Sequence, residues 1–311
     1  MRKFERGMLM LVGGQVIWGI APALIGGFLG GVPASLVLTI RHFIGGILFV
    51  GILLASGRVL GTTRIQRTIV FQLLFWSVLT SGLAEILWIR AIQDAGVIIA
   101  TLLVRLEIPF AVVFAAWYLR EQITLPIALA AVLSMSGVVL LTISRPDDAS
   151  HPYLFRGALE GFAGALLWTW AGVYAKKMLT DGSSPVLLSA LRTWIGGLFN
   201  AIVVLLTISA IPQAVMALSR NQWLVILYLA VFSSVIGMLF YYRGMEYTSA
   251  SVAGVLLGVS LLIATLGGLV IGERLLPLQW LGAAMILTAI VLTSNVHGSL
   301  KRLLKLTQVT S

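Results

Sequence analysis

Apolar runs of eighteen or more residues recur along the whole chain, and no other feature constrains its fold as strongly. Each run is long enough to cross the roughly 30 Å hydrocarbon core of a bilayer as a helix. Hydrophobic residues make up 59% of the 311 residues and charged residues only 10%, whereas an ordinary soluble domain has about 25% charged residues. The mean hydropathy of +1.03 agrees with this pattern. We therefore predict a polytopic membrane protein.

Polar breaks divide the chain into ten apolar windows, which we interpret as transmembrane helices. Only helices and closed barrels satisfy their backbone hydrogen bonds in lipid, and the sequence lacks the alternating pattern of barrel strands. The first window is too long for the core of a signal peptide, so we expect it to be retained. The predicted spans are residues 8–30, 33–55, 68–89, 95–119, 123–143, 157–175, 185–209, 222–242, 248–272 and 275–296.

Lysine and arginine gather on one side of this predicted topology. Counting alternate loops from the N-terminus places thirteen on one side and five on the other. The positive-inside rule puts the richer side, with both termini, in the cytoplasm of a plasma or inner membrane. The net charge of +10 is spread between apolar runs, with no basic domain. Nucleic acid is therefore not an expected partner.

Two stretches of similar sequence begin 151 residues apart, RHFIGG at Arg41 and RTWIGG at Arg192. Trp18 and Trp168 recur at nearly the same offset, and each lies four residues after a glycine. This pattern indicates two five-helix repeats. Because five is odd, the second repeat must be inverted relative to the first, which is a common basis for alternating access.

The domain boundaries follow from the same repeat. We predict a first repeat at residues 1–146, a polar linker at 147–153, a second and inverted repeat at 154–296, and a basic cytoplasmic tail at 297–311. The predicted fold class is thus an all-α membrane protein of ten transmembrane helices, built from two inverted five-helix repeats.

With these repeats, the chain resembles the drug/metabolite transporter superfamily and, within it, the EamA-type transporters. The resemblance covers essentially everything except the tail. It rests on Trp18-Gly19, on Arg41, on AIQDAGVIIATLLVRLEIPFAVVFAAWYLREQI in predicted spans 3 and 4, and on the counterparts Trp168, Arg192 and GMEYTSASVAGVLLGVSLLIATLGGLVIGERL. One departure concerns predicted span 9, where the family often has a proline and this chain has Leu261 or Leu262.

This resemblance implies a secondary-active transporter that exports amino acids or related compounds, without a cofactor. Buried arginines favour an anionic or zwitterionic solute over a purely cationic one. The sequence has no GxxxxGK[ST] loop, so direct coupling to ATP is not expected. The energy would come from an ion gradient, with protons as a candidate coupling ion, from exchange, or from the solute gradient itself. Besides the solute, the expected partner is the lipid bilayer.

Six charged residues fall inside the predicted spans, three of each sign. A charge at the bilayer centre costs on the order of 3 kcal/mol or more, so such residues usually pair or line a wet cavity. The six residues are Arg41, Glu85, Arg105, Glu107, Glu160 and Arg192.

The stretch RLEIP in predicted span 4 is the first candidate binding site. Arg105 and Glu107 lie ~200° apart on a helix, so they cannot easily pair with each other. Pro109 has no N–H and deprives the carbonyl of Arg105 of its helical partner, which predicts a kink. Arg105 is then a candidate for bidentate capture of a carboxylate. The alternative is a purely structural pair between Arg105 and Glu85.

Two glutamates and two tryptophans within the predicted spans are further candidates for the binding site. Glu85 and Glu107 are candidate solute ligands or proton carriers, because an apolar cavity disfavours an ionised carboxyl, or they form static salt bridges. Trp18 and Trp168 lie midway along predicted spans 1 and 6 and are candidates for the wall of a binding site.

The duplicated arginines Arg41 and Arg192 point to a role that both halves need, such as gating or structure. Pro109 is assigned to the same gating or structural class, since a kink changes the course of the helix.

Two other function classes are weighed against an amino acid transporter. Transport of phosphorylated or nucleotide-linked sugars would require Arg41, Arg105 and Arg192 to converge on one cavity. An integral-membrane enzyme is a remote alternative, because the sequence has no cysteine, no HExxH motif and no aspartate within a predicted span. Its three scattered histidines predict no metal site.

Overall fold

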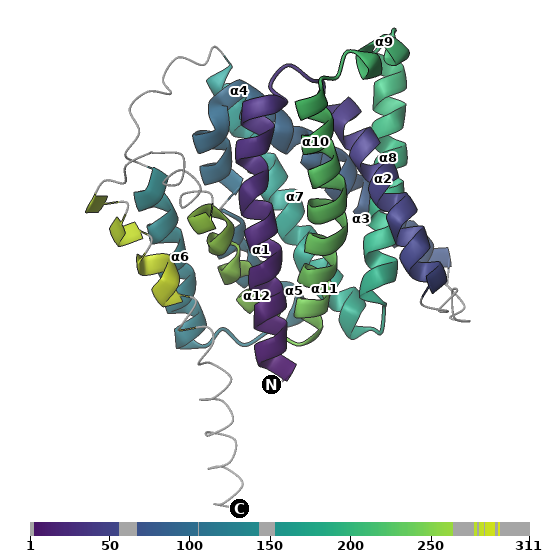
Figure 1. Ribbon diagram of the computed structural model, residues 1–311. Helices are drawn as coiled ribbons and strands as arrows, with labels where there is room; N and C mark the ends of the chain where they lie inside the picture. The colour runs from purple at the N-terminus through teal and green to yellow at the C-terminus, as the bar shows by residue number, and fades with distance from the viewer. Residues whose placement is uncertain are drawn as a thin grey trace, which may run out of the picture.

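The computed structural model describes residues 3–55, 67–104, 106–142 and 153–263, together with 277–292 except 279, 283, 290 and 291. Every regular element within these residues is a helix (Figure 1). The elements are α1 (Lys3–Phe28), α2 (Ala34–Ala55), α3 (Arg67–Ser77), η1 (Val78–Ala84), α4 (Glu85–Val104), α5 (Glu107–Leu119), α6 (Leu125–Thr142), α7 (Leu154–Thr180), α8 (Pro185–Thr207), α9 (Ile211–Met216), α10 (Arg220–Tyr228), η3 (Leu229–Gly237), α11 (Met238–Glu246) and α12 (Ala250–Leu256).

The described residues confirm the predicted all-helical membrane fold. Five helical segments are long and apolar enough to cross a membrane, namely Lys3–Phe28, Ala34–Ala55, Phe71–Asp94, Pro185–Thr207 and Arg220–Glu246. Shorter apolar helices occupy Glu107–Leu119, Leu125–Gly137, Ala250–Ile263 and Trp280–Ala289. Together with α7, which has charged residues near both ends, these segments correspond one to one with the ten predicted spans. The short helix α9 was not predicted.

The two halves of the bundle run in opposite directions. At the start of α1, Gly7 packs on the backbone of Gly244, near the end of α11. At the end of α7, Lys176 Nζ donates a hydrogen bond to the carbonyl of Met245, 2.6 Å away. The first helix of one half therefore begins where the first helix of the other half ends. We call this the N-terminal end of the bundle.

The break predicted at residues 90–94 contains no non-helical residue, because α4 runs from Glu85 to Val104. The chain nevertheless turns back inside α4. A Cβ on Gly161 would lie 3.4 Å from Leu103 Cβ and 3.5 Å from Ala91 Cβ, although twelve residues of straight helix would separate the last two by ~18 Å. Predicted spans 3 and 4 are thus two limbs packed against α7.

Two real interruptions occur at equivalent places in the halves. The amide of Leu106 bonds to the carbonyl of Leu103, and that of Leu257 bonds to the carbonyl of Gly254, both at 3.1 Å. Pro109 lies three residues after Leu106, and Ser260 lies three residues after Leu257. The position that corresponds to Pro109 is therefore Ser260, and the sequence comparison was wrong to place it at Leu261 or Leu262. Because the second half breaks without a proline, Pro109 is not required for such a break.

Among the described residues, each half contains one π-helical segment, η1 in the first and η3 in the second. They begin at Val78 and Leu229, so their offset matches that of the sequence repeat. A π-helix widens the turn and releases backbone groups, and such segments frequently occur at functional sites. Both segments face the interior at the boundary between the halves.

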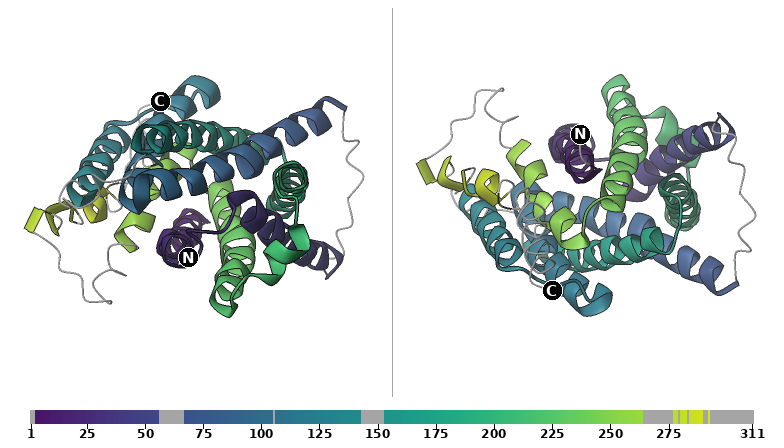
Figure 2. Two further views of the ribbon diagram at one scale, coloured as in Figure 1. Left: turned by 90° about the horizontal axis from the view of Figure 1, so that it is seen from above. Right: turned by 90° about the horizontal axis from the view of Figure 1, so that it is seen from below.

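The repeated glycines let α2 and α8 cross closely. A Cβ on Gly46 would lie 2.8 Å from the Trp194 ring, and one on Gly197 would lie 3.0 Å from His42 Cβ. Viewed along the bundle axis, this pair of helices lies on one side of α1 (Figure 2). On the other side α6 packs with Ile286 and Ala289 in a separate apolar cluster.

Candidate functional site

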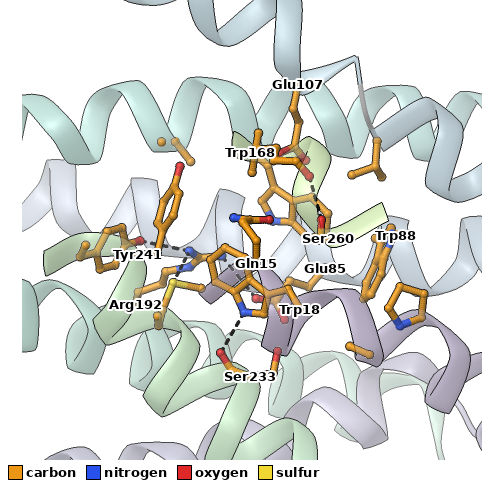
Figure 3. A pocket seen from close by; sticks show the side chains of 18 of the residues that line it. Gln15, Trp18, Glu85, Trp88, Glu107, Trp168, Arg192, Ser233, Tyr241 and Ser260 are labelled. Carbon is orange, nitrogen blue, oxygen red and sulfur yellow. Dashed lines mark hydrogen bonds and ion pairs between the residues drawn. The ribbon is translucent and has the colours of Figure 1, made fainter. Parts of the chain in front are cut away.

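A cavity of about 130 Å³ lies between the two halves at the level of the π-helical segments. Side chains from α1, α2, α4, α5, α7, α8, η3 and α11 line it, together with Leu257 and Ser260 from the interrupted span after α11. Figure 3 shows these side chains converging from opposite sides of the bundle. The cavity therefore belongs to neither half alone.

Its charged wall centres on Glu85, the first residue of α4. Glu85 Oε2 lies 2.7 Å from Arg41 Nη2 and 3.4 Å from His42 Nε2, and Glu85 Oε1 lies 3.4 Å from Arg192 Nη2. All four side chains are buried. One carboxylate is thus shared by two arginines, one from each half.

The two arginines also make matching bonds across the boundary between the halves. Arg41 Nε donates to Ser234 Oγ of η3 at 2.8 Å, and Arg192 Nε donates to Ser81 Oγ of η1 at 2.6 Å. Each arginine comes from the second span of its half and reaches the π-helical segment of the other half. The repeated RxxxGG motif thus builds the same contact twice.

Arg192 makes further hydrogen bonds beyond this matching pair. Its Nη1 donates to the hydroxyl of Tyr242 at 3.0 Å and to the Met238 sulfur at 3.2 Å. Met238 stands four residues after Ser234, just as Glu85 stands four residues after Ser81. A thioether in one half thus replaces the carboxylate of the other, which makes the charged wall one-sided.

The two predicted wall tryptophans are related in the same way. Trp18 Nε1 donates to the carbonyl of Ser233, and Trp168 Nε1 donates to the carbonyl of Thr80, both at 3.1 Å. Each indole binds a backbone oxygen in the π-helical segment of the opposite half. The rings therefore hold the halves together and line the cavity.

Glu107 is the first residue of α5, only 7% exposed, and lines the cavity on the side away from Arg192. A carboxylate is favourable at a helix N-terminus. Glu107 also lines a smaller cavity of about 20 Å³, which shares Trp168 and Tyr241 with the first and continues to Met245 near the N-terminal end of the bundle. The smaller cavity thus lies on the side of Glu107 that faces the N-terminal end of the bundle.

Most of the site residues predicted from sequence lie in this one cavity. Trp18, Trp168, Glu85 and Glu107, predicted as solute-binding, line one cavity, and so do Arg41 and Arg192, which were assigned to gating or structure. Pro109 is the third residue of α5 and is absent from the lining. Arg105 lies outside the described residues. The alternative pairing of Arg105 with Glu85 meets competition, because Glu85 already contacts two arginines.

Several lining residues were missed from sequence, chiefly Gln15, Tyr241 and Tyr242. The candidates predicted within the spans were charged residues and tryptophans, whereas these side chains are an amide and two phenols. Gln15 had a usable signal, because an amide inside the apolar run MLVGGQVIWG needs a hydrogen-bonding partner within the membrane. The tyrosine pair lies near the end of its predicted span and resembles an interfacial anchor.

Charged residues outside the cavity pair near the two ends of the bundle. Glu160 Oε1 lies 3.1 Å from Arg90 Nη2, and Arg156 Nη2 lies 2.7 Å from Asp94 Oδ2. At the N-terminal end, Glu121 accepts hydrogen bonds from the first amides of α12 at 2.9 and 3.2 Å. Within the described residues, no group of three His, Asp or Glu side chains could hold a metal ion.

Comparison with known proteins gives a consistent result. The model of the EamA-like transporter family matches residues 5–143 and again residues 155–295. An uncharacterized transporter of Bacillus subtilis (strain 168), YyaM, is 24% identical over 179 residues, which are 57% of this chain and 58% of that protein. The aligned part thus spans little more than half of the relative. A solved crystal structure with 19% identity covers 93% of this chain and 98% of its own, with a TM-score of 0.77, so the two share a fold.

Proposed function

Because the chain belongs to the EamA-like transporter family, whose members are membrane transporters, we propose that it carries a small zwitterionic or anionic metabolite through the cavity described above. Amino acids and related compounds are the proposed solutes, and export by alternating access is the proposed mode. The observation that carries this proposal is the cluster of Arg41, Glu85 and Arg192, in which two halves of the protein share one carboxylate inside a cavity.

The size of the cavity favours a small solute. A volume of about 130 Å³ is close to the ~150 Å³ of an engineered cavity that binds benzene. It is well below the roughly 300–1,000 Å³ of pockets that take drug-sized ligands. An amino acid matches this scale better than a nucleotide-linked sugar does.

The charges favour a solute with a carboxylate. Two guanidinium groups share the single carboxylate of Glu85, so the cluster has one positive charge in excess and attracts an anionic group. Glu107 lies across the cavity from Arg192 (Figure 3), where it would attract an amino group. A solute with both groups fits both sides. Arg105 remains a second proposed ligand for the carboxylate.

Alternating access follows from where the bonds between the halves lie. Arg41, Arg192, Trp18 and Trp168 each bond to the π-helical segment of the other half. A rocking motion of one half against the other would have to exchange these contacts. We propose Glu107 as the proton carrier when transport is coupled to protons, since it borders both cavities.

The proposed orientation places the N-terminal end of the bundle in the cytoplasm of a plasma or inner membrane. Lys3, Arg120, Lys176 and Arg243 belong to the basic-rich side of the predicted topology, and lysine and arginine favour the cytoplasmic side. Export would then load the solute from this end, past Met245 and Glu107.

A second candidate function is the transport of phosphorylated or nucleotide-linked sugars. The proximity of Arg41 and Arg192 in one cavity favours it. Their shared contact with Glu85 and the size of the cavity count against it. We therefore retain it as the runner-up, to be separated by the same assay.

The test is counterflow in liposomes that contain the purified protein. Labelled amino acids, organic acids, amines and sugar phosphates are offered outside against unlabelled solute inside, for the native protein, Arg192→Gln and Arg105→Ala. We expect small zwitterions or anions to exchange in the native protein, and both variants to lose most of that activity. Exchange of amines alone would contradict the proposal, preferential exchange of sugar phosphates would support the runner-up, and recovery of a chemically altered solute would indicate an enzyme.

A further inference from the structure

We propose that Gln15 is a specificity-determining residue, which recognises a carboxylate oxygen of the solute through its side-chain amide. This inference rests on the proposed function and deepens it. Gln15 lies on α1, one turn before Trp18, and lines the cavity between the halves. The chemistry that it selects is a hydrogen-bond acceptor, and in an amino acid the carboxylate supplies it.

The first observation is an unused donor. The Gln15 side chain is 1% exposed, and its Nε2 atom is fully buried without any hydrogen-bonding partner among the described residues. Buried donors are nearly always paired, because leaving one unpaired costs the free energy of its lost hydration. We infer that the unpaired Gln15 amide donates its hydrogen bond to an acceptor atom of the bound solute.

The second observation is that the packing of the first helix in each half does not require a glutamine at this position. The residue that corresponds to Gln15 in α7 is Ala165, three residues before Trp168, and it is completely buried. The first helix of each half therefore packs in the same register with or without the amide. Because packing does not require the glutamine, its chemistry is the remaining reason for the extra polar atoms.

The third observation is the position of the amide. Figure 3 shows Gln15 near the middle of the cavity, between Arg192 and Tyr241 on one side and Glu107 and Ser260 on the other. A carboxylate next to Arg192 could accept one hydrogen bond from the guanidinium and one from the Gln15 amide. An amino group on the same solute would then face Glu107. An amine that lacks the carboxylate would leave the amide unpaired, so it should bind less well.

The test compares solutes that differ only in the carboxylate. The probes are leucine with 3-methylbutylamine and serine with ethanolamine, offered in counterflow to the native protein, Gln15→Leu and Gln15→Glu. Gln93→Leu is the matched control, since this glutamine of α4 donates to the carbonyl of Val32 in the connection between α1 and α2 and does not line the cavity. Melting temperatures in detergent are measured for all four proteins without solute.

We expect the native protein to prefer the carboxylated member of at least one pair. Gln15→Leu should lose about tenfold or more of that preference, as the loss of one hydrogen bond to a charged group predicts. Gln15→Glu should favour the amine, because its carboxylate repels that of the solute. The melting temperature of Gln15→Leu should equal or exceed the native value, whereas Gln93→Leu should keep the native preference.

Three results would overturn the inference. An unchanged preference in Gln15→Leu means that the amide only meets a water molecule, and it leaves the proposed function intact. A lower melting temperature together with an unchanged preference in Gln15→Glu means that the residue is structural. Failure of the native protein to exchange any of the four probes would contradict the proposed amino acid transport and the inference together.

Discussion

The two halves of this protein share a scaffold but not a chemistry. Both halves have an arginine that reaches across to a serine, a tryptophan that binds a backbone carbonyl, a π-helical segment and a break in the fourth span of the half. Yet Gln15, Glu85 and Glu107 of the first half correspond to Ala165, Met238 and Gly258 of the second.

This difference separates two requirements. The duplicated residues hold the halves together, which a rocking mechanism needs equally on both sides. The residues found only in the first half supply amide and carboxylate groups to the cavity. Symmetry thus accounts for the fold, and departures from symmetry account for the polar character of the site.

The largest expected effect comes from removing the one carboxylate that both halves share. Glu85→Gln leaves Arg41 and Arg192 buried without a counter-ion, so we expect the free energy of unfolding to fall by about 3–5 kcal/mol and transport to be lost. Unfolding of the purified protein in mixed micelles of increasing SDS measures this loss. Glu160→Gln is the control, because its partner Arg90 is partly exposed and such a pair contributes less than about 1 kcal/mol. Equal losses would contradict the central role of Glu85.

The next prediction tests whether the similar stretches RHFIGG and RTWIGG are packed equally tightly. In RTWIGG a Cβ on Gly196 would lie 3.0 Å from the backbone carbonyl carbon of Ser81, whereas in RHFIGG a Cβ on Gly45 would lie 3.4 Å from Ser234 Cβ. We expect Gly196→Ala to lower the free energy of unfolding by up to about 3 kcal/mol, since the backbone must shift. Gly45→Ala should have a much smaller effect. The same unfolding measurement decides, and equal losses would show that the two crossings are packed alike.

A smaller and symmetric effect is expected at the serines that receive the arginines. Ser81→Ala and Ser234→Ala each remove one buried hydrogen bond to a charged group, which is worth about 1.5 kcal/mol or more. The two losses should agree closely, because the bonds occupy equivalent places. Unfolding of both variants provides the comparison. A difference of more than about 1 kcal/mol would mean that only one of the two contacts stabilises the bundle.

The smallest effect is expected where the halves differ by a proline. Ser260→Pro gives the second half the residue that Pro109 gives the first, at the third position of a helix that already starts after a break. Proline is tolerated in the first turn of a helix, so the change removes the side-chain contacts of Ser260, among them the bond from its Oγ to the Leu257 carbonyl. We expect a change of less than about 1 kcal/mol and retained transport. A severe loss would show that the second break depends on an intact backbone N–H.

Much of the fold could be predicted from sequence because its causes are local. Apolar length, loop charge and the repeat beginning at Arg41 and Arg192 were sufficient for the membrane class, the helices and the two-repeat architecture. The reversal inside α4 was expected as a loop, since Arg90 and Asp94 are polar. Nothing in the sequence distinguishes a polar loop from a reversal made by helical residues.

The site was less predictable because its contacts join distant residues. Trp18 and Trp168 could be selected by depth, but their carbonyl partners Ser233 and Thr80 could not. Glu85 had several possible partners, and the one considered from sequence was Arg105 in the next predicted span, as the alternative to solute binding by Arg105. Span 1 is apolar on all sides, so periodicity could not tell whether Gln15 faces lipid, another helix or a cavity.

The sequence alone thus determined that this chain enters a membrane, forms helices and repeats itself in inverted form, because hydrophobic transfer and backbone hydrogen bonding act within each segment. The tertiary structure decided which charges meet and where the cavity lies. Arg41 and Ser234 are 193 positions apart, and only the crossing of the two halves brings them together.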